Sequence, residues 1–203
     1  MAKKVILGGI VAGVVMFVWG AVSHMILQLG DAGLSQLSDE EPVLAAIRAH
    51  VKEPGLYFYP GLPSEHPTPE QQKEWEGKYR AGPAGLLLTV PTGGEAMPPS
   101  KLLIQLLTDV AIALLVGVLL VQANGWMSSF GSRVLFATLV GFTPFLAVNL
   151  PYWNWYGFPT VFTLAQMADR VIGFVLIGLV LAFFVKPYAP QGRGLQEAVA
   201  QAA

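Results

Sequence analysis

The sequence contains no cysteine, and only 12% of its 203 residues are charged. The absence of cysteine excludes disulfides, thiolate metal sites and cysteine nucleophiles. Soluble domains carry roughly 25% charged residues, so the shortage of charge argues against a large soluble core. The formal net charge is −1, and a chain without a basic surplus is not suited to binding nucleic acid. No serine nucleophile elbow, phosphate loop or paired-carboxylate motif is present, so the sequence gives no positive sign of an enzyme.

The chain is rich in long apolar segments. Hydrophobic residues make up 54% of it and are concentrated in residues 5–29, 102–121, 134–150 and 160–185. A helix needs about 20 predominantly apolar residues to cross a bilayer. The first run is longer than the apolar core of about 7–15 residues in a secretory signal peptide, so we predict a membrane span there. The sequence predicts an all-α membrane protein, a four-transmembrane-helix bundle with a small extracytoplasmic α/β insertion between helices 1 and 2.

The predicted insertion, which we call the cap, occupies residues 31–100. Residues 1–30 form the first span with a cytoplasmic N-terminus, residues 101–186 the other spans, and residues 187–203 a cytoplasmic tail. Within the cap, Ser38 and Glu41 predict a capping box, and Thr68 before Pro69 predicts a second helix start. Residues 56–59 and 86–90 are predicted strands. The apolar content of the cap is low for an independent core, so we expect it to pack on the membrane helices.

Two prolines shape the prediction for the third span. Pro144 lies within it and is expected to kink it, and Pro151 is expected to end it. Residues 152–159 then form a tight turn. Four aromatic side chains in this turn are typical of an interfacial belt: Tyr152, Trp153, Trp155 and Tyr156. A quinone or lipid headgroup resting on these rings is the alternative.

Basic residues outside the cap predict the orientation in the membrane. In the assumed topology they all fall on one side of the membrane: Lys3, Lys4, Arg133, Lys186 and Arg193. Short segments rich in lysine and arginine stay in the cytoplasm, whereas long loops translocate regardless of their charge. Both termini are therefore predicted to be cytoplasmic, and the cap to be extracytoplasmic.

Ionisable residues in the second and fourth spans predict a polar cluster. Residues 171–185 are uncharged but span only about 22 Å as a helix, which is short of a bilayer core of about 30 Å. Asp169 and Arg170 are therefore drawn towards the membrane, and we predict that Arg170 meets Asp109 there. Each span also carries a stripe of small or polar residues, as bundle-facing surfaces do. The predicted intramembrane cluster comprises Asp109, Arg170, Asp169, His24, Asn149, Gln105 and Gln166.

This cluster has two interpretations. The first interpretation is structural: the cluster holds the helices in register, or Arg170 extends to the membrane interface. The second interpretation is functional: the cluster is a site for a substrate, an ion or a proton, since intramembrane ionisable residues are functional candidates. Haem or pigment ligation by His24 lacks a second histidine in the spans, and His50 and His66 lack the spacing of a zinc motif. We expect no cofactor and no metal.

Four stretches of the chain carry a family resemblance: VMFVWGAVSHM, EPGLYFYPG, YRAGPAGLLL and YWNWYGFPTVFTLAQM. Together they resemble a family of bacterial four-span integral membrane proteins to which no activity is attached. The resemblance covers most of the chain. It implies a location in the bacterial cytoplasmic (inner) membrane and implies no chemistry.

The expected function is non-enzymatic. A small chain without catalytic motifs and with an exposed cap is suited to be an accessory or stabilising subunit of a larger membrane complex, with membrane lipids and other membrane protein subunits as partners. The alternative is a small transporter or proton-linked carrier that uses the intramembrane Asp/Arg/His cluster. A third interpretation is a quinone- or pigment-binding redox subunit.

Overall fold

The computed structural model describes residues 2–90 and 92–186. Four helical segments are long and apolar enough to cross a membrane: Ala2–Ile26, Pro99–Gln122, Phe130–Tyr156 and Thr160–Phe184. They agree with the predicted helical membrane protein. The predicted tail, residues 187–203 with Arg193, lies outside the described residues.

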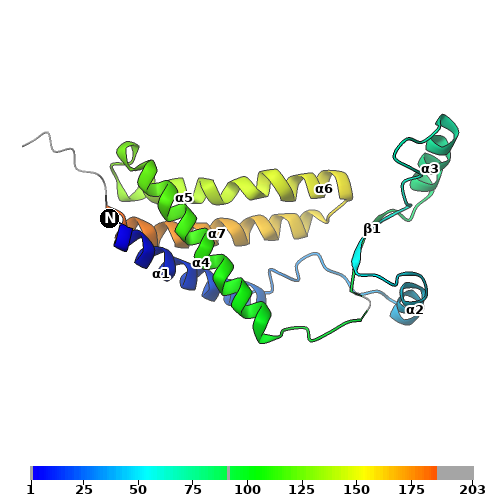
Figure 1. Cartoon of the computed structure of the whole chain (residues 1–203), viewed down its shortest axis with the longest axis horizontal. Helices are drawn as coiled ribbons and strands as arrows, with labels where there is room; N and C mark the ends of the chain where they lie inside the picture. The colour runs from blue at the N-terminus through cyan, green and yellow to red at the C-terminus, as the bar shows by residue number, and fades with distance from the viewer. Residues whose placement is uncertain (1, 91, 187–203) are drawn as a thin grey trace, which may run out of the picture.

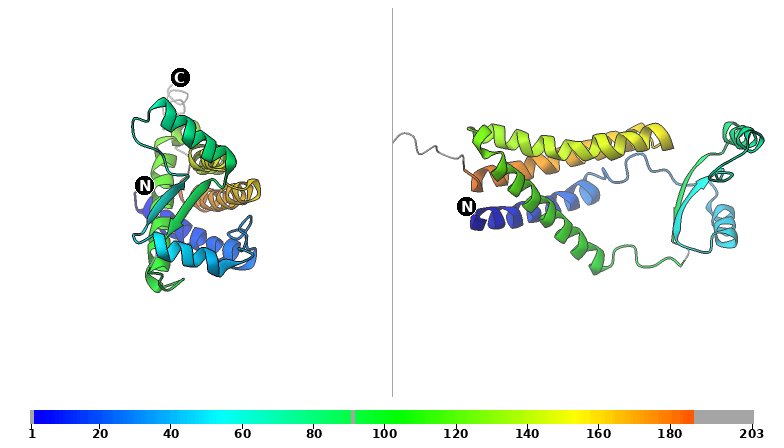
Figure 2. Two further views of the ribbon diagram at one scale, coloured as in Figure 1. Left: turned by 90° about the vertical axis from the view of Figure 1, so that its right-hand side faces the viewer. Right: turned by 45° about the horizontal axis from the view of Figure 1, so that its top comes forward.

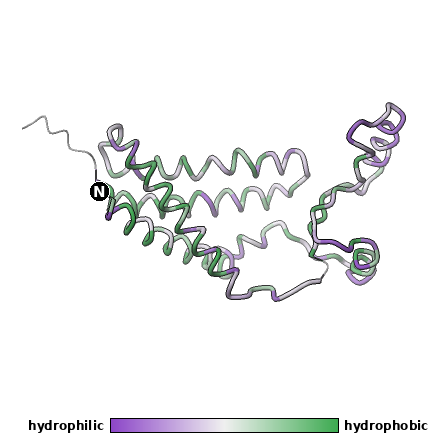
Figure 3. The backbone as a smooth tube through the Cα atoms, viewed as in Figure 1, coloured by the Kyte–Doolittle hydropathy of each residue, from purple (hydrophilic) through white to green (hydrophobic). Residues whose placement is uncertain are grey.

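The four segments pack in an order that differs from their order in the sequence. Helix α1 (Ala2–Ala21) lies between α4 (Pro99–Gln122) and α7 (Thr160–Phe184), and α5 (Phe130–Pro144) packs on α7. The start of α1 and the end of α7 lie at the same end of the bundle, and the cap lies beyond the opposite end (Figure 1). The membrane helices are mostly hydrophobic along their length, whereas the cap is mixed and more hydrophilic (Figure 3).

Buried apolar side chains are concentrated in the half of the bundle away from the cap. Ala12, Val116, Leu120, Ile177 and Leu181 belong to one buried cluster in this half. On the cap side α4 diverges from α1 (Figure 2, right), and the residues of α4 that precede Asp109 are exposed or half-buried. The divergence leaves room for the polar cavity described below.

The close approach of α1 and α4 depends on Gly9 and Gly13. A Cβ atom on Gly13 would lie 2.7 Å from the backbone nitrogen of Val110, and one on Gly9 would lie 3.1 Å from the Cα atom of Leu114. Small residues at i and i+4 allow helix backbones to approach in this way. The contact fixes the point from which α4 diverges towards the cap.

The third span continues past Pro151, so the prediction that it ends there is wrong. Helix α5 passes into a π-helical turn, η3 (Phe145–Asn149), and then into α6 (Leu150–Tyr156). In the π turn the N–H of Leu150 bonds to the carbonyl of Phe145, five residues earlier. A π turn re-routes the backbone hydrogen bonds that a proline interrupts, and Pro151 lies in the first turn of α6, where its missing N–H is tolerated.

The aromatic residues 152–156 are therefore helical, and the predicted tight aromatic turn is restricted to residues 157–159. Gly157 ends α6 in the left-handed conformation, with φ of 72°, which glycine adopts without a steric penalty. The four aromatic side chains of the predicted belt are all exposed at the cap-side end of the bundle.

The cap consists of α2 (Glu40–His50), β1 (Gly55–Tyr59), α3 (Pro69–Ala81) and β2 (Gly85–Thr89). The strands pair antiparallel, with Tyr57 opposite Leu87. Helix α3 begins as predicted, because Thr68 and Gln71 form a capping box with Pro69 in the first turn. The predicted cap at Ser38 is wrong: Asp39 is the N-cap of α2, without a side-chain hydrogen bond. Glu40 and Glu41 instead place negative charge in the first turn, where the helix dipole favours it.

The cap has no buried core of its own, because no side chain among residues 31–90 is buried. It is also not packed against the membrane helices as expected, since none of the closely packed pairs of elements joins the two. A cavity of about 850 Å³ lies between one face of the sheet and the aromatic end of α6. The sheet contributes Leu56, Phe58, Leu86 and Leu88, and the bundle contributes Tyr152, Trp155, Tyr156 and Phe158.

Candidate functional site

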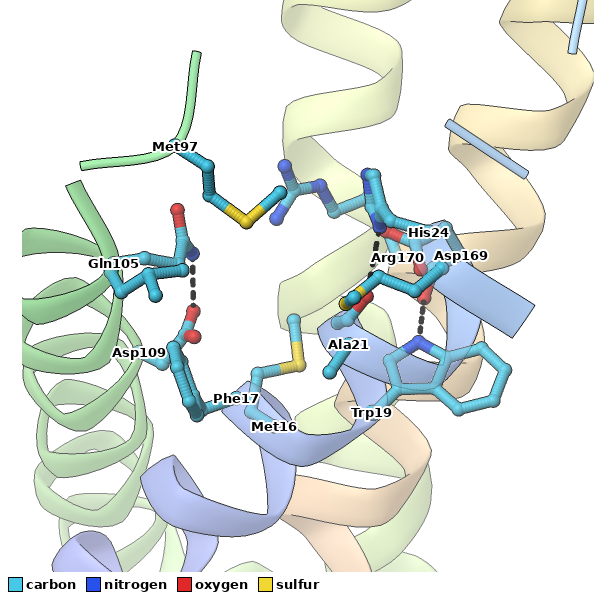
Figure 4. A pocket seen from close by; sticks show the side chains of 13 residues that line it. Met16, Phe17, Trp19, Ala21, His24, Met97, Gln105, Asp109, Asp169 and Arg170 are labelled. Carbon is cyan, nitrogen blue, oxygen red and sulfur yellow. Dashed lines mark hydrogen bonds between the residues drawn. The ribbon is translucent and has the colours of Figure 1, made fainter. Parts of the chain in front are cut away.

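A second cavity lies inside the cap-side half of the bundle, and we call it the polar cavity because residues of the predicted polar cluster line part of it. It has a volume of about 250 Å³ and is bordered by the end of α1, the first half of α4, the middle of α7 and Met97 of the linker before α4. Five residues of the predicted cluster line it: His24, Gln105, Asp109, Asp169 and Arg170. Figure 4 shows Gln105 and Asp109 on the α4 wall, with His24, Asp169 and Arg170 on the other side of the opening.

The α4 wall holds a buried carboxylate. Asp109 is only 2% exposed, and its Oδ1 accepts a hydrogen bond of 2.9 Å from Nε2 of Gln105. The two residues are four apart, so the helix itself places one above the other. Gln105 therefore orients the Asp109 carboxylate without neutralising its charge.

The α7 wall holds an acidic and a basic residue next to each other in the chain. Asp169 is 5% exposed, and its backbone carbonyl accepts a hydrogen bond of 3.1 Å from Nε1 of Trp19. Its side-chain Oδ1 is buried and has no hydrogen-bond partner among the described residues. Arg170 is half-buried and borders the same cavity. This wall thus holds a guanidinium beside a buried carboxylate oxygen that has no hydrogen-bond partner among the described residues.

The predicted direct contact between Asp109 and Arg170 is not formed. Ion pairs within 4.0 Å among residues 2–90 and 92–186 are confined to the cap, where Arg48, Lys78 and Arg80 pair with neighbouring glutamates. The divergence of α4 from the rest of the bundle separates the two walls. The cluster therefore surrounds a cavity in place of forming a salt-bridged helix contact.

His24 lies in a π-helical turn, η1 (Val22–Ile26), that continues α1. Its Nδ1 is 3.1 Å from the backbone carbonyl of Gly20 and 2.8 Å from Oγ of Ser23. A carbonyl oxygen only accepts, so the contact with Gly20 requires a proton on Nδ1 and leaves Nε2 as the basic nitrogen of the neutral ring. The π turn and these bonds hold the imidazole at the edge of the cavity.

Two members of the predicted cluster do not line the cavity. Asn149 belongs to η3 in the third span, and Gln166 lies on α7 one turn before Arg170. The structure adds Met16, Trp19 and Met97, which prediction from charged and amide residues missed. Met16 lies at helical spacing between Gly13 and Gly20, in the stripe of small and polar residues on the first span, whereas Met97 comes from a linker that has no periodic signal.

The chemistry of this cavity follows from its few polar groups and its charge. Most of its lining is apolar, with a small number of polar groups, as in sites for small ligands. Asp109, Asp169 and Arg170 sum to a formal charge of −1, which a bound cation, a proton or a protonated His24 would balance. Among the described residues, no three His, Asp or Glu side chains converge in the way that metal ligands do.

Comparison with models of protein families, with curated proteins and with solved structures gave no match.

Proposed function

We propose that the protein is a small, non-enzymatic membrane carrier that binds a ligand bearing a cationic group, or a proton, in the cavity between Asp109, Asp169 and Arg170. The observation that carries the proposal is the separation of these charges around an open space. Of the expected functions, the geometry therefore supports the proton-linked carrier more strongly than the accessory subunit.

Electrostatics gives the physical reason. A buried carboxylate that lacks a counter-ion is unfavourable, and removing the partner of a buried charge typically costs about 3–5 kcal/mol. Asp109 has one amide hydrogen bond, and Oδ1 of Asp169 has none among the described residues. An ammonium group or a proton entering the cavity would remove this penalty. Arg170 is then available to the carboxylate of a zwitterionic ligand.

We place the protein in a bacterial cytoplasmic membrane with its termini in the cytoplasm. Support comes from Lys4, Arg133 and Lys186, which border one cavity at the end of the bundle away from the cap. The positive-inside rule assigns that end to the cytoplasm. The polar cavity then lies in the outer half of the membrane and faces the extracytoplasmic cap.

Replacing Asp109 with asparagine is expected to abolish the selectivity of the cavity for cations. The purified protein is titrated with ethylammonium, alanine and propionate while its thermal unfolding is followed. Ethylammonium or alanine should raise the Tm and propionate should not. Asp109→Asn keeps the partner of Gln105 but removes the charge, and hydrogen bonds to charged groups contribute about 1.5–3 kcal/mol, so we expect at least about tenfold weaker binding.

The matched control is Gln166→Ala, which changes a polar residue on a membrane helix outside the cavity. It should leave the titrations unchanged. Proton transfer is followed in parallel in liposomes that contain a pH-sensitive dye and carry an imposed pH gradient. The proposal is contradicted if neither ethylammonium nor alanine binds and the pH gradient decays equally with the wild type, with Asp109→Asn and with protein-free liposomes.

An accessory subunit is the second candidate, and the open sheet face of the cap supports it. Leu56 is 65% exposed and Leu88 is 77% exposed on the sheet face that borders the cavity next to α6, and a segment of a partner subunit that enters this cavity would cover them. Native mass spectrometry of the protein extracted gently from its own membranes tests this. A defined assembly that Leu88→Ser disrupts would support the accessory role; a wild-type protein that carries no other subunit would contradict it.

A further inference from the structure

The end of the bundle away from the cap contains a buried arginine that the polar cavity does not use. Arg133 lies in the first turns of α5, after the Ser129 cap, and is only 4% exposed. Its Nη2 donates a hydrogen bond of 3.2 Å to the carbonyl of Ala182, in the last turn of α7. This bond satisfies a carbonyl that the helix leaves free at its C-terminus, where a positive charge is also favourable.

The other N–H groups of this guanidinium are unpaired within the part of the chain that the structure describes. Nε and Nη1 of Arg133 are buried and lack a hydrogen bond among the described residues. The positive charge of Arg133 lies over the ring of Phe130 in a cation–π contact, with its Cζ 6.0 Å from the centre of the ring. No aspartate or glutamate occurs in residues 2–30, 110–168 or 170–186, which build the body of the membrane helices. A buried, unpaired charge is strongly unfavourable, so this arrangement calls for an anion.

Arg133 borders a cavity of about 590 Å³ that has two further cations at its edge. Lys4 comes from the start of α1, and Lys186 follows α7. The backbone at Lys186 is held in place, because Nδ2 of Asn124 donates a hydrogen bond of 2.9 Å to its carbonyl. Three positive charges from three different segments therefore converge on one opening.

The remaining walls of this cavity are apolar. Leu7 is 55% exposed and Phe183 is 73% exposed, and both border the cavity on the outside of membrane helices. A free anion in water has no need of such walls, whereas a phospholipid presents a phosphate and acyl chains together. Basic pockets between transmembrane helices on the cytoplasmic side bind anionic lipid headgroups by this combination of contacts.

We infer that the cavity between α1, α5 and α7 binds the phosphate of an anionic phospholipid in the leaflet away from the cap. The phosphate oxygens accept hydrogen bonds from the free N–H groups of Arg133, Lys4 and Lys186 surround the headgroup, and the acyl chains lie along Leu7 and Phe183. Arginine suits this role because its planar fork matches phosphate oxygens.

Native mass spectrometry of the detergent-purified full chain tests this inference with equal amounts of phosphatidylglycerol and phosphatidylcholine. The wild type should retain phosphatidylglycerol preferentially. Each lysine near a headgroup contributes about 1 kcal/mol, which corresponds to about fivefold in binding, so Lys4→Gln and Lys186→Gln should each lower the preference about fivefold. These exposed lysines leave the bond between Arg133 and Ala182 intact, so loss of folding does not confuse the result.

Arg133→Gln should remove the preference, and Arg48→Gln, which deletes an exposed arginine of the cap, should leave it unchanged. Equal binding of the two lipids by the wild type, or a preference unaffected by both lysine variants, would overturn the inference. Competition by inorganic phosphate that releases the bound lipid as effectively as phosphatidylglycerol does would show a free-anion site instead.

Discussion

Replacing Gly13 with alanine is expected to destabilise the bundle by about 1–3 kcal/mol, the usual effect of overpacking a close contact. The new methyl group would lie 2.7 Å from the backbone nitrogen of Val110 and 2.7 Å from its Cγ2. Backbone atoms cannot rotate away as a flexible side chain can, so α1 and α4 must separate. Because this crossing fixes where α4 begins to diverge, the substitution should also disturb the polar cavity.

Gly20 provides a matched control on the same helix. A Cβ atom there meets nothing within 4 Å, and alanine is favoured over glycine in a helix by about 0.8–1.0 kcal/mol. Gly20→Ala should therefore be neutral or stabilising, whereas Gly13→Ala should lower the Tm. Thermal unfolding of both variants in the same detergent measures the difference. Equal Tm values for the two variants would show that the α1–α4 contact is not as close as described.

Features with a local physical cause were predictable from the sequence. The four apolar segments follow from the length of helix that crosses a bilayer, and the start of α3 follows from Thr68 and Pro69. The strands were found from short apolar runs that end at prolines. Asp109, Asp169, Arg170 and His24 were found because ionisable residues are rare in membrane helices. Each of these signals is contained in a few neighbouring residues.

Features that depend on distant packing were not predictable. Pro151 was expected to end the third span, but the π turn before it allows the helix to continue. Arg133 was used only as a sign of orientation, whereas the start of α5 at Phe130 buries it against α7. The contact between Asp109 and Arg170 was predicted from the short uncharged run of residues 171–185, but the divergence of α4 keeps the two side chains on opposite walls. The spacing of residues along a helix predicts how deep each residue lies in the membrane and on which face of the helix it lies. It does not predict the angle at which two helices cross.

A binding role for the polar cavity requires that water can reach it. A structural cluster would be closed by its own ion pairs, whereas a binding site must admit its ligand. Single cysteines can separate the two cases cleanly, because the natural sequence contains no cysteine. Ala21 lines the cavity, and Val18, about one helical turn earlier, is 55% exposed on the outside of α1 and does not line it.

The most direct test compares the reaction of Ala21→Cys and Val18→Cys with a membrane-impermeant thiosulfonate reagent in liposomes. The thiolate is the reactive form of cysteine. An apolar medium raises the pKa of a buried thiol by up to about 3–5 units, so a cysteine that faces lipid reacts slowly. We predict that Ala21→Cys reacts about 100-fold faster or more, and that ethylammonium slows it. Equal, slow labelling at both positions would mean that the cavity is dry, and would contradict a carrier built around Asp109, Asp169 and Arg170.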